Sequence, residues 1–241
     1  MTVRGALGHG DRAWTRRATF GLLGGAVCGA FLPLPVVAAR AEELVFRILR
    51  AEDEIGEHRV TFRRLPPDIL EVTTDIEVAV RLALFTVYSF RERVVARWRN
   101  GRMVAAAIEI EDQGEARAFD VAEEEGGLVL HAAGSRRPLP AGCLTDIDFW
   151  TLEITRQTAV LDTWTGEMVP IEVRPGPVER LHLGPTAVTA RRFALRANRG
   201  RSGEVWYAAD GTWVRGRLRT RGEDLVYVPR GLPLVAQSGQ T

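Results

Sequence analysis

The sequence predicts a mainly β protein, in which a curved or half-closed, barrel-like antiparallel β-meander is covered by one α-helix near residues 145–157. Three observations predict this fold class. Apolar and polar residues alternate over several runs, turn-forming pairs separate these runs at short intervals, and helical periodicity is almost absent outside one segment. Strands that follow one another through tight turns form a meander, which must curve or close to protect its edges.

The clearest strand covers residues 70–82. Its alternate residues are apolar or threonine, and charged residues such as Glu71, Asp75 and Arg81 lie between them, so one face is apolar and the other is exposed to solvent. Shorter alternating runs follow at residues 104–110, 169–173 and 214–218. The turn signals between the strands are Asn100-Gly101, Gln113-Gly114, Gly126-Gly127, Thr165-Gly166, Asp210-Gly211 and Gly222-Glu223.

The one predicted helix begins at Thr145, three residues before Asp148, in a pattern similar to a capping box. Ile147, Trp150 and Ile154 then recur at helical spacing, and the pattern ends near residue 157. This helix would separate two β segments and cover one mouth of the curved sheet.

Residues 1–41 have the pattern of a cleaved signal peptide that precedes a single β-rich domain, residues 42–241. A basic region containing Arg16-Arg17 is followed by the apolar stretch 20–37 and by Ala39-Arg40-Ala41, which predicts cleavage before Glu42. The arginine pair resembles a twin-arginine leader, and a general secretory signal is the alternative. Both routes predict a periplasmic protein whose mature chain has no transmembrane span.

The composition of the mature chain excludes several functions. The precursor has 32 basic and 31 acidic residues, and the leader contains five arginines and Asp11, so 27 basic and 30 acidic residues remain, a net charge of −3. Such a chain lacks the positive field of a nonspecific nucleic-acid binder. Cys143 has no internal disulfide partner, and it is either a buried inert thiol or a reactive one. His58, His131 and His182 are too scattered to predict a metal site, and no motif predicts a cofactor.

The segment 82–88 departs from the alternating pattern, because both of its faces are apolar. It is either covered core, or it lines a cavity or contacts a partner. Leu84 and Tyr88 continue the inward parity of the strand 70–82. The candidate ligand-binding residues are therefore Leu82, Leu84, Tyr88 and two tryptophans that could edge a pocket, Trp150 and Trp206.

Two sets of charged residues could carry a function. Two rows of arginines each share one strand face: Arg215, Arg217 and Arg219 in one row, and Arg91, Arg93, Arg97 and Arg99 in the other. Each row could bind an anion or a partner protein. Alternatively, each row pairs across strands with acids such as Glu109, Glu111 or Glu204. Asp146, Asp148 and Asp162 are either an acid/base set near a cavity mouth or helix-terminal and turn residues.

Four segments carry a resemblance to a known family: Asp53–Val60, Trp98–Arg102, Leu161–Gly166 and Val205–Val214. Their order resembles an uncharacterised family of exported proteobacterial proteins with no assigned function. The resemblance implies a fold more than a chemistry, and it implies no catalytic residue. More distantly, the layout is similar to periplasmic lipoprotein carriers, in which a curved antiparallel sheet wraps a helical plug and holds acyl chains.

The function that these observations favour is non-catalytic binding or transport, in the periplasm, of an amphiphilic or lipid-like ligand held in the curved sheet. One alternative is an envelope assembly or scaffold protein that meets its partner through the arginine rows. The other is a cofactor-independent enzyme that uses the carboxylates near Asp146–Asp162, which requires polar side chains to converge in one pocket.

Overall fold

The computed structural model of the chain describes residues 43–82, 85–197 and 200–231, which lie in one compact unit, residues 38–241. The predicted signal peptide, its cleavage site and Leu84 fall outside these residues and stay predictions. The described strands are β1 Glu43–Arg50, β2 Asp53–Leu65, β3 Ile69–Leu82, β4 Phe85–Arg99, β5 Arg102–Asp112, β6 Glu115–Glu124, β7 Gly127–Ala132, β8 Ser135–Leu139, β9 Ala159–Asp162, β10 Glu167–Leu183, β11 Thr186–Ala197, β12 Ser202–Ala208, β13 Trp213–Thr220 and β14 Glu223–Pro229.

All these strands belong to one antiparallel sheet of 14 strands with the order β8-β7-β6-β5-β4-β3-β2-β1-β14-β13-β12-β11-β10-β9. Strands that follow one another in the chain are paired, except β8 and β9, which are the two edges of the sheet. In addition, β1 pairs with β14. The sheet is therefore a meander whose two halves are joined at β1 and β14, and it is not closed. The prediction of a mainly β, antiparallel meander is confirmed.

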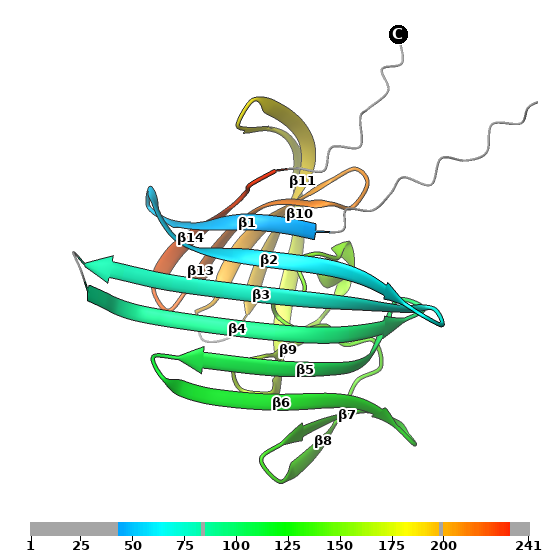
Figure 1. Ribbon diagram of the computed structural model, residues 1–241. Helices are drawn as coiled ribbons and strands as arrows, with labels where there is room; N and C mark the ends of the chain where they lie inside the picture. The colour runs from blue at the N-terminus through cyan, green and yellow to red at the C-terminus, as the bar shows by residue number, and fades with distance from the viewer. Residues whose placement is uncertain (1–42, 83–84, 198–199, 232–241) are drawn as a thin grey trace, which may run out of the picture. The chain divides into compact units, whose positions relative to one another are not determined.

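The sheet folds over itself, so that its two halves form layers. Figure 1 shows β2–β6 nearest the viewer, with β10 and β13 behind them and running across their direction. The inward residues of the strands pack between these layers, as Phe46 of β1 does, with its ring stacked on Trp213 at 3.8 Å between centroids. The hairpins follow the sequence signals: Asn100 and Gly101 both have positive φ, at 52° and 74°, as a two-residue turn of this type requires.

The predicted covering α-helix at residues 145–157 is wrong. The described residues contain no α-helix, and this region holds only a short 3-10 helix, η1 Leu152–Arg156. The backbone on either side of Thr145 pairs with strand β9: Leu161 N–H donates to Leu144 O at 2.8 Å, and Asp146 N–H donates to Leu161 O at 3.0 Å. The hydrogen bonds that a helix would need are thus used to cover the sheet edge.

A second, smaller apolar cluster lies on the opposite face of β10–β13. Its buried members are Leu181, Ala190, Trp206 and Val214. Trp206 is flanked in β12 by Val205 and Tyr207, which both belong to the main core, so the tryptophan points to the other face of the sheet. In this region the sheet is therefore covered by apolar side chains on both faces. Among the described residues, no helix is long and apolar enough to cross a membrane.

Candidate functional site

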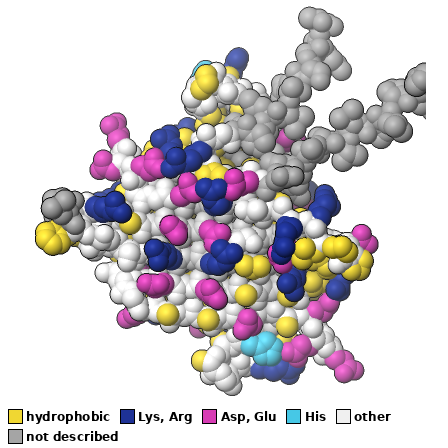
Figure 2. All heavy atoms as spheres, viewed as in Figure 1, with side chains coloured by type: hydrophobic (Ala, Val, Ile, Leu, Met, Phe, Trp, Pro, Cys, Tyr) yellow, Lys and Arg dark blue, Asp and Glu magenta, His cyan; other side chains and the backbone are white. Residues whose placement is uncertain are grey.

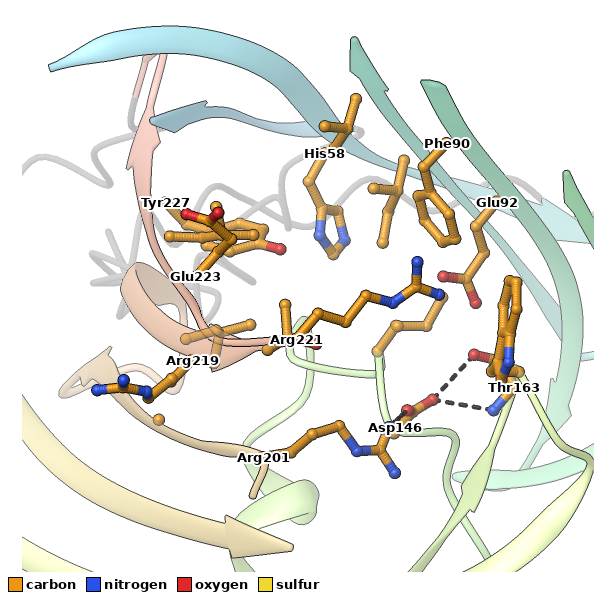
Figure 3. A pocket seen from close by; sticks show the side chains of 18 of the residues that line it. His58, Phe90, Glu92, Asp146, Thr163, Arg201, Arg219, Arg221, Glu223 and Tyr227 are labelled. Atoms are coloured by element: carbon orange, nitrogen blue, oxygen red, sulfur yellow. Dashed lines mark hydrogen bonds and ion pairs between the residues drawn. The ribbon is translucent and has the colours of Figure 1, made fainter. Parts of the chain in front are cut away.

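A cavity of about 660 Å³ lies between the two halves of the folded sheet. Its walls are mainly apolar side chains from strands of both halves, and Figure 3 shows it with polar groups projecting from several sides. The apolar lining residues include Ile55, Ile76, Val78, Val80, Phe90, Ile110, Phe149, Ile154, Val160, Ile171, Leu195, Leu218 and Leu225. This size and this lining are typical of sites that hold small organic ligands.

The mouth of the cavity lies between the β3–β4 hairpin and the β13–β14 turn. Val87, in the first hairpin, lines the cavity and is 52% exposed, and its neighbour Phe85 is 75% exposed. Arg50, Arg219 and the exposed residue Glu223 contribute charged groups to the same opening. In Figure 2 apolar atoms are visible at the tip where β3 and β4 meet.

Arg221 connects the two sides of this mouth. It occupies the two-residue β13–β14 turn, with a φ of 53°, and its guanidinium Nη1 donates to Asp112 Oδ2 at 2.6 Å and to Tyr88 Oη at 3.0 Å. The guanidinium carbon also lies 4.8 Å from the ring centroid of Trp164. Because Asp112 belongs to β5 and Tyr88 to β4, one side chain holds the C-terminal half of the sheet against the N-terminal half.

Another part of the cavity wall contains two carboxylates held by one arginine. Arg201 Nη1 donates to Asp146 Oδ2 at 2.7 Å, and its Nη2 donates to Asp162. Asp146 Oδ1 also accepts from the backbone N–H of Thr163 at 3.1 Å and from its hydroxyl at 3.0 Å. Burial is the main cause that raises the pKa of Asp146, the charge of Asp162 raises it further, and Arg201 opposes both effects.

Two buried polar side chains in the cavity wall lack complete hydrogen bonding. Among the described residues, the two ring nitrogens of His58 have no hydrogen-bond partner, and neither does the Oε1 atom of Glu92. His58 is 1% exposed and Glu92 5%. Burial lowers the pKa of His58 to about 3, and burial followed by the charge of Asp146 raises the pKa of Glu92 to about 8. Both shifts favour the uncharged form of the side chain at neutral pH, although an unsatisfied buried polar group still costs about 1–3 kcal/mol.

A family model described as a domain of unknown function, DUF6134, matches residues 46–230. The chain belongs to the DUF6134 family. The matched range contains both halves of the sheet and every polar cavity residue described above, so the site is built within the family domain. The prediction of a family without an assigned function is confirmed at that level, whereas its exported, proteobacterial origin stays a prediction.

The fold is shared with a solved structure of low sequence identity. That structure is described as a beta-barrel-like protein of domain of unknown function DUF1849 from Brucella abortus; it has 8% identity and a TM-score of 0.54, and the match covers 78% of this chain and 94% of that one. At this identity the similarity shows a shared fold only. No curated protein matches the sequence. The likeness to lipoprotein carriers stays a prediction.

The three predicted ligand-binding residues whose side chains are described, Tyr88, Trp150 and Trp206, do not lie in one site. Tyr88 lines the cavity at its mouth. Leu82 is the last residue of β3, but its side chain and Leu84 lie outside what the structure describes. Trp150 is buried in the main core, where its indole N–H donates to Asp148 Oδ1 at 2.8 Å. Trp206 lies on the other face of the sheet, where its indole N–H donates to Glu179 Oε2 at 3.0 Å.

Six of the seven arginines in the two rows have acidic neighbours, as the pairing alternative predicts, but most of these partners differ from those expected. Figure 2 shows basic and acidic side chains interleaved over the viewed face. Arg217 lies 3.9 Å from Glu204, Arg219 lies 3.8 Å from Asp224, and Arg215 lies over the Trp206 ring at 5.6 Å. The pairs of the other row are Arg91–Glu77, Arg93–Asp75, Arg97–Glu71 and Arg99–Glu123.

The remaining candidates do not add a chemical site. His131 pairs with Glu124 at 2.7 Å, and His182 is exposed on β10. Cys143 is buried, and burial raises the pKa of its thiol to about 12. Within the described ranges, no three His, Cys, Asp or Glu side chains are grouped so that they could hold a metal ion.

Sequence reasoning passed over His58 and Glu92 as site residues, although a signal was present. Glu92 has the inward parity of the apolar row Phe90, Val94, Ala96 and Trp98 in β4. His58 has the parity of Val60 and Phe62 in β2 in the same way. A polar residue in an otherwise apolar row is the pattern that could have identified both.

Proposed function

We propose that the protein is a periplasmic, non-catalytic binding or carrier protein for an amphiphilic, lipid-like ligand held in the cavity between the two halves of the sheet. The observation that carries the proposal is the cavity of about 660 Å³ with apolar walls and an exposed apolar mouth at Phe85 and Val87. A normally packed protein core has few voids larger than a water molecule, and this cavity is far larger than that. Burial of an apolar chain would gain about 25 cal/mol per Å² of surface removed from water.

Charge is distributed along the cavity in a way that suits an amphiphile. Arg50, Arg219 and Arg221 lie at the mouth, where a charged head group would remain in contact with water. The walls farther in are formed by residues such as Ile76 and Ile110, which suit an apolar chain. A ligand with a polar head and an apolar tail would therefore enter tail first.

The test compares two tryptophan substitutions at adjacent positions of β3. Val78 lines the cavity, whereas Ala79 is exposed on the other face of the strand. Val78→Trp should fill the cavity and abolish binding of a fluorescent fatty acid, and Ala79→Trp should leave binding unchanged. Native mass spectrometry of the parent protein should show a copurifying lipid. Absence of both a bound lipid and fatty-acid binding in the parent would end the carrier proposal.

An enzyme is the second candidate, because Asp146, Asp162, Thr163 and Glu92 do converge on one cavity. Arg201 already pairs with both aspartates, which leaves Glu92 as the side chain with a free oxygen. An enzyme that used these groups would change the mass of a bound amphiphile over time, and Asp146→Asn would stop that change without stopping binding. In the arginine row of the scaffold alternative, Arg217 and Arg219 have carboxylate neighbours, and Arg215 lies over the Trp206 ring.

The periplasmic location is tested through the leader. Arg16 and Arg17 replaced together by lysine should leave the precursor in the cytoplasm if the twin-arginine route is used. A normal periplasmic yield would exclude this route and leave the general secretory one.

A further inference from the structure

His58 and Glu92 lie on one transverse row of the sheet and face the same cavity. In the strand register His58 is opposite Ile76, and Ile76 is opposite Glu92. Two strand spacings place their backbones roughly 10 Å apart. Figure 3 shows the imidazole and the carboxyl group both pointing into the cavity. Two nearly fully buried side chains with unpartnered polar atoms thus border the same space.

Both side chains can donate and accept a hydrogen bond in their uncharged forms. Burial keeps His58 neutral by lowering its pKa, and burial with the nearby charge of Asp146 keeps Glu92 protonated by raising its pKa. A neutral imidazole has one N–H donor and one acceptor nitrogen, and a protonated carboxyl has one O–H donor and acceptor oxygens. A hydroxyl group of a ligand matches either side chain.

The carboxylates beside Glu92 make this end of the cavity unfavourable for an anion. Asp146 and Asp162 share the single positive charge of Arg201. Their charges are already strong enough to contribute to the raised pKa of Glu92. A second carboxylate, brought in on a ligand, would lose its hydration and meet the same repulsion.

Basic side chains line the mouth of the cavity. Arg50, Arg219 and Arg221 lie there, and their carboxylate neighbours are Glu223, Asp224 and Asp112. Along β4, Glu92 lies five positions after Val87 at the mouth, which is about 17 Å in an extended strand and close to the reach of a saturated chain of about twelve carbon atoms. An anionic head at the mouth would thus place the far end of such a chain near Glu92.

We infer that the inner end of the cavity, at His58 and Glu92, binds an uncharged hydrogen-bonding group, such as a hydroxyl, on the end of the apolar chain that lies away from the head group. The inference rests on the proposed carrier function and names the class of ligand: a single-chain anionic amphiphile with a polar but uncharged tail end.

The test uses three ligands of equal chain length: dodecanoate, 12-hydroxydodecanoate and dodecanedioate. Displacement of a fluorescent fatty acid from the full chain gives the dissociation constant of each. One additional hydrogen bond should make 12-hydroxydodecanoate bind about tenfold tighter than dodecanoate. Dodecanedioate should bind at least about tenfold more weakly than 12-hydroxydodecanoate, because its second carboxylate would lie beside Asp146.

Three variants locate the effect. Glu92→Leu removes the donor and should reduce the preference for the hydroxylated ligand to about twofold or less, whereas Glu92→Gln keeps an uncharged donor and should retain it. His58→Phe should reduce the preference in the same direction. Circular dichroism and thermal unfolding confirm that each variant is folded.

The outcomes separate this inference from the proposed function. Equal affinity of the parent protein for dodecanoate and 12-hydroxydodecanoate would overturn the inference and leave the carrier function standing. A hydroxyl preference that survives in both Glu92→Leu and His58→Phe would overturn it as well, since the group would then bind elsewhere. If none of the three ligands binds and no lipid copurifies, the carrier function itself fails and the inference falls with it.

Discussion

Replacing Glu92 with glutamine should make the stability of the protein less dependent on pH. Glu92 is 5% exposed, and its strand neighbours in register are Ile76 on β3 and Ile110 on β5. Burial, followed by the charge of Asp146, raises its pKa from 4.5 to about 8, while a hydrogen bond from Thr163 opposes the change. The folded protein therefore holds a proton that the unfolded chain releases at much lower pH.

The direction of the effect follows from proton binding. Between pH 4.5 and about 8 the folded state binds more protons at Glu92 than the unfolded state, so the free energy of unfolding decreases as the pH rises. The stabilising contribution of the protonated group is complete below pH 4.5 and is lost as the pH rises through 8. A difference of this size in pKa corresponds to roughly 5 kcal/mol. Glutamine does not titrate, so Glu92→Gln should gain stability relative to the parent by up to about that amount across this range.

The measurement is urea unfolding at several pH values between 5 and 8, followed by the fluorescence of buried tryptophans such as Trp98 and Trp213. His58 has the opposite influence, because its lowered pKa makes the folded state less stable as the pH falls below 6.5. It is present in both proteins, so it cancels in the difference between them. If the unfolding free energies of parent and variant run parallel from pH 5 to 8, Glu92 is ionised in the folded protein and the reasoning is refuted.

Three further predictions concern other parts of the unit. Arg201→Met should lower the free energy of unfolding by about 3 kcal/mol, since it leaves the carboxylates of Asp146 and Asp162 together without a cation, and adding Asp146→Asn should restore part of the loss in the same urea titration. Gly56→Ala should cost about 3 kcal/mol, because the added Cβ would overlap the carbonyl oxygen of Glu77. Gly231→Ala should be neutral, because no heavy atom of the described residues would contact the added Cβ. Cys143 should remain unmodified when the native protein is treated with a thiol reagent at pH 8, because the thiol is buried and burial raises its pKa to about 12. The same cysteine should be fully modified in denaturant. Modification of the native protein at the rate of the denatured protein would contradict this prediction.

The strands could be predicted from the sequence because their signal is local. In β3 the inward residues Val72, Thr74 and Ile76 are buried at alternate positions, as the pattern predicts. The predicted helix failed for the opposite reason. Thr145 and Asp148 have the spacing of a capping box, and Thr145 N–H does donate to Asp148 Oδ2 at 2.7 Å. The backbone on either side of Thr145 is nevertheless bonded to β9, and no local pattern reports that distant partner.

The alternation of side chains along each strand predicts more of the site than the candidate residues named from the sequence. Trp206 follows Val205 and precedes Tyr207, so alternation alone places it on the opposite face from the main core, to which those two residues belong. The same rule places Glu92 on the inner face. In contrast, the contact of Arg201 with Asp146 joins positions 55 residues apart, and it exists because β9 and β12 belong to the same half of the folded sheet. Such a contact depends on the topology and cannot be derived from periodicity.

The segment 140–158 both covers an edge of the sheet and lines the cavity. Because β1 pairs with β14, the sheet is left with β8 and β9 as its edges, and this segment is the chain connection between them. Its residues Leu144 and Asp146 cover the free edge of β9 through backbone hydrogen bonds, and the side chains of Asp146, Phe149 and Ile154 line the cavity. Protection of an exposed edge and construction of the cavity wall are therefore performed by the same segment, and Asp146 contributes to both. A substitution in this segment should change stability and ligand preference together, whereas one at the mouth, such as Arg219, should change ligand binding alone.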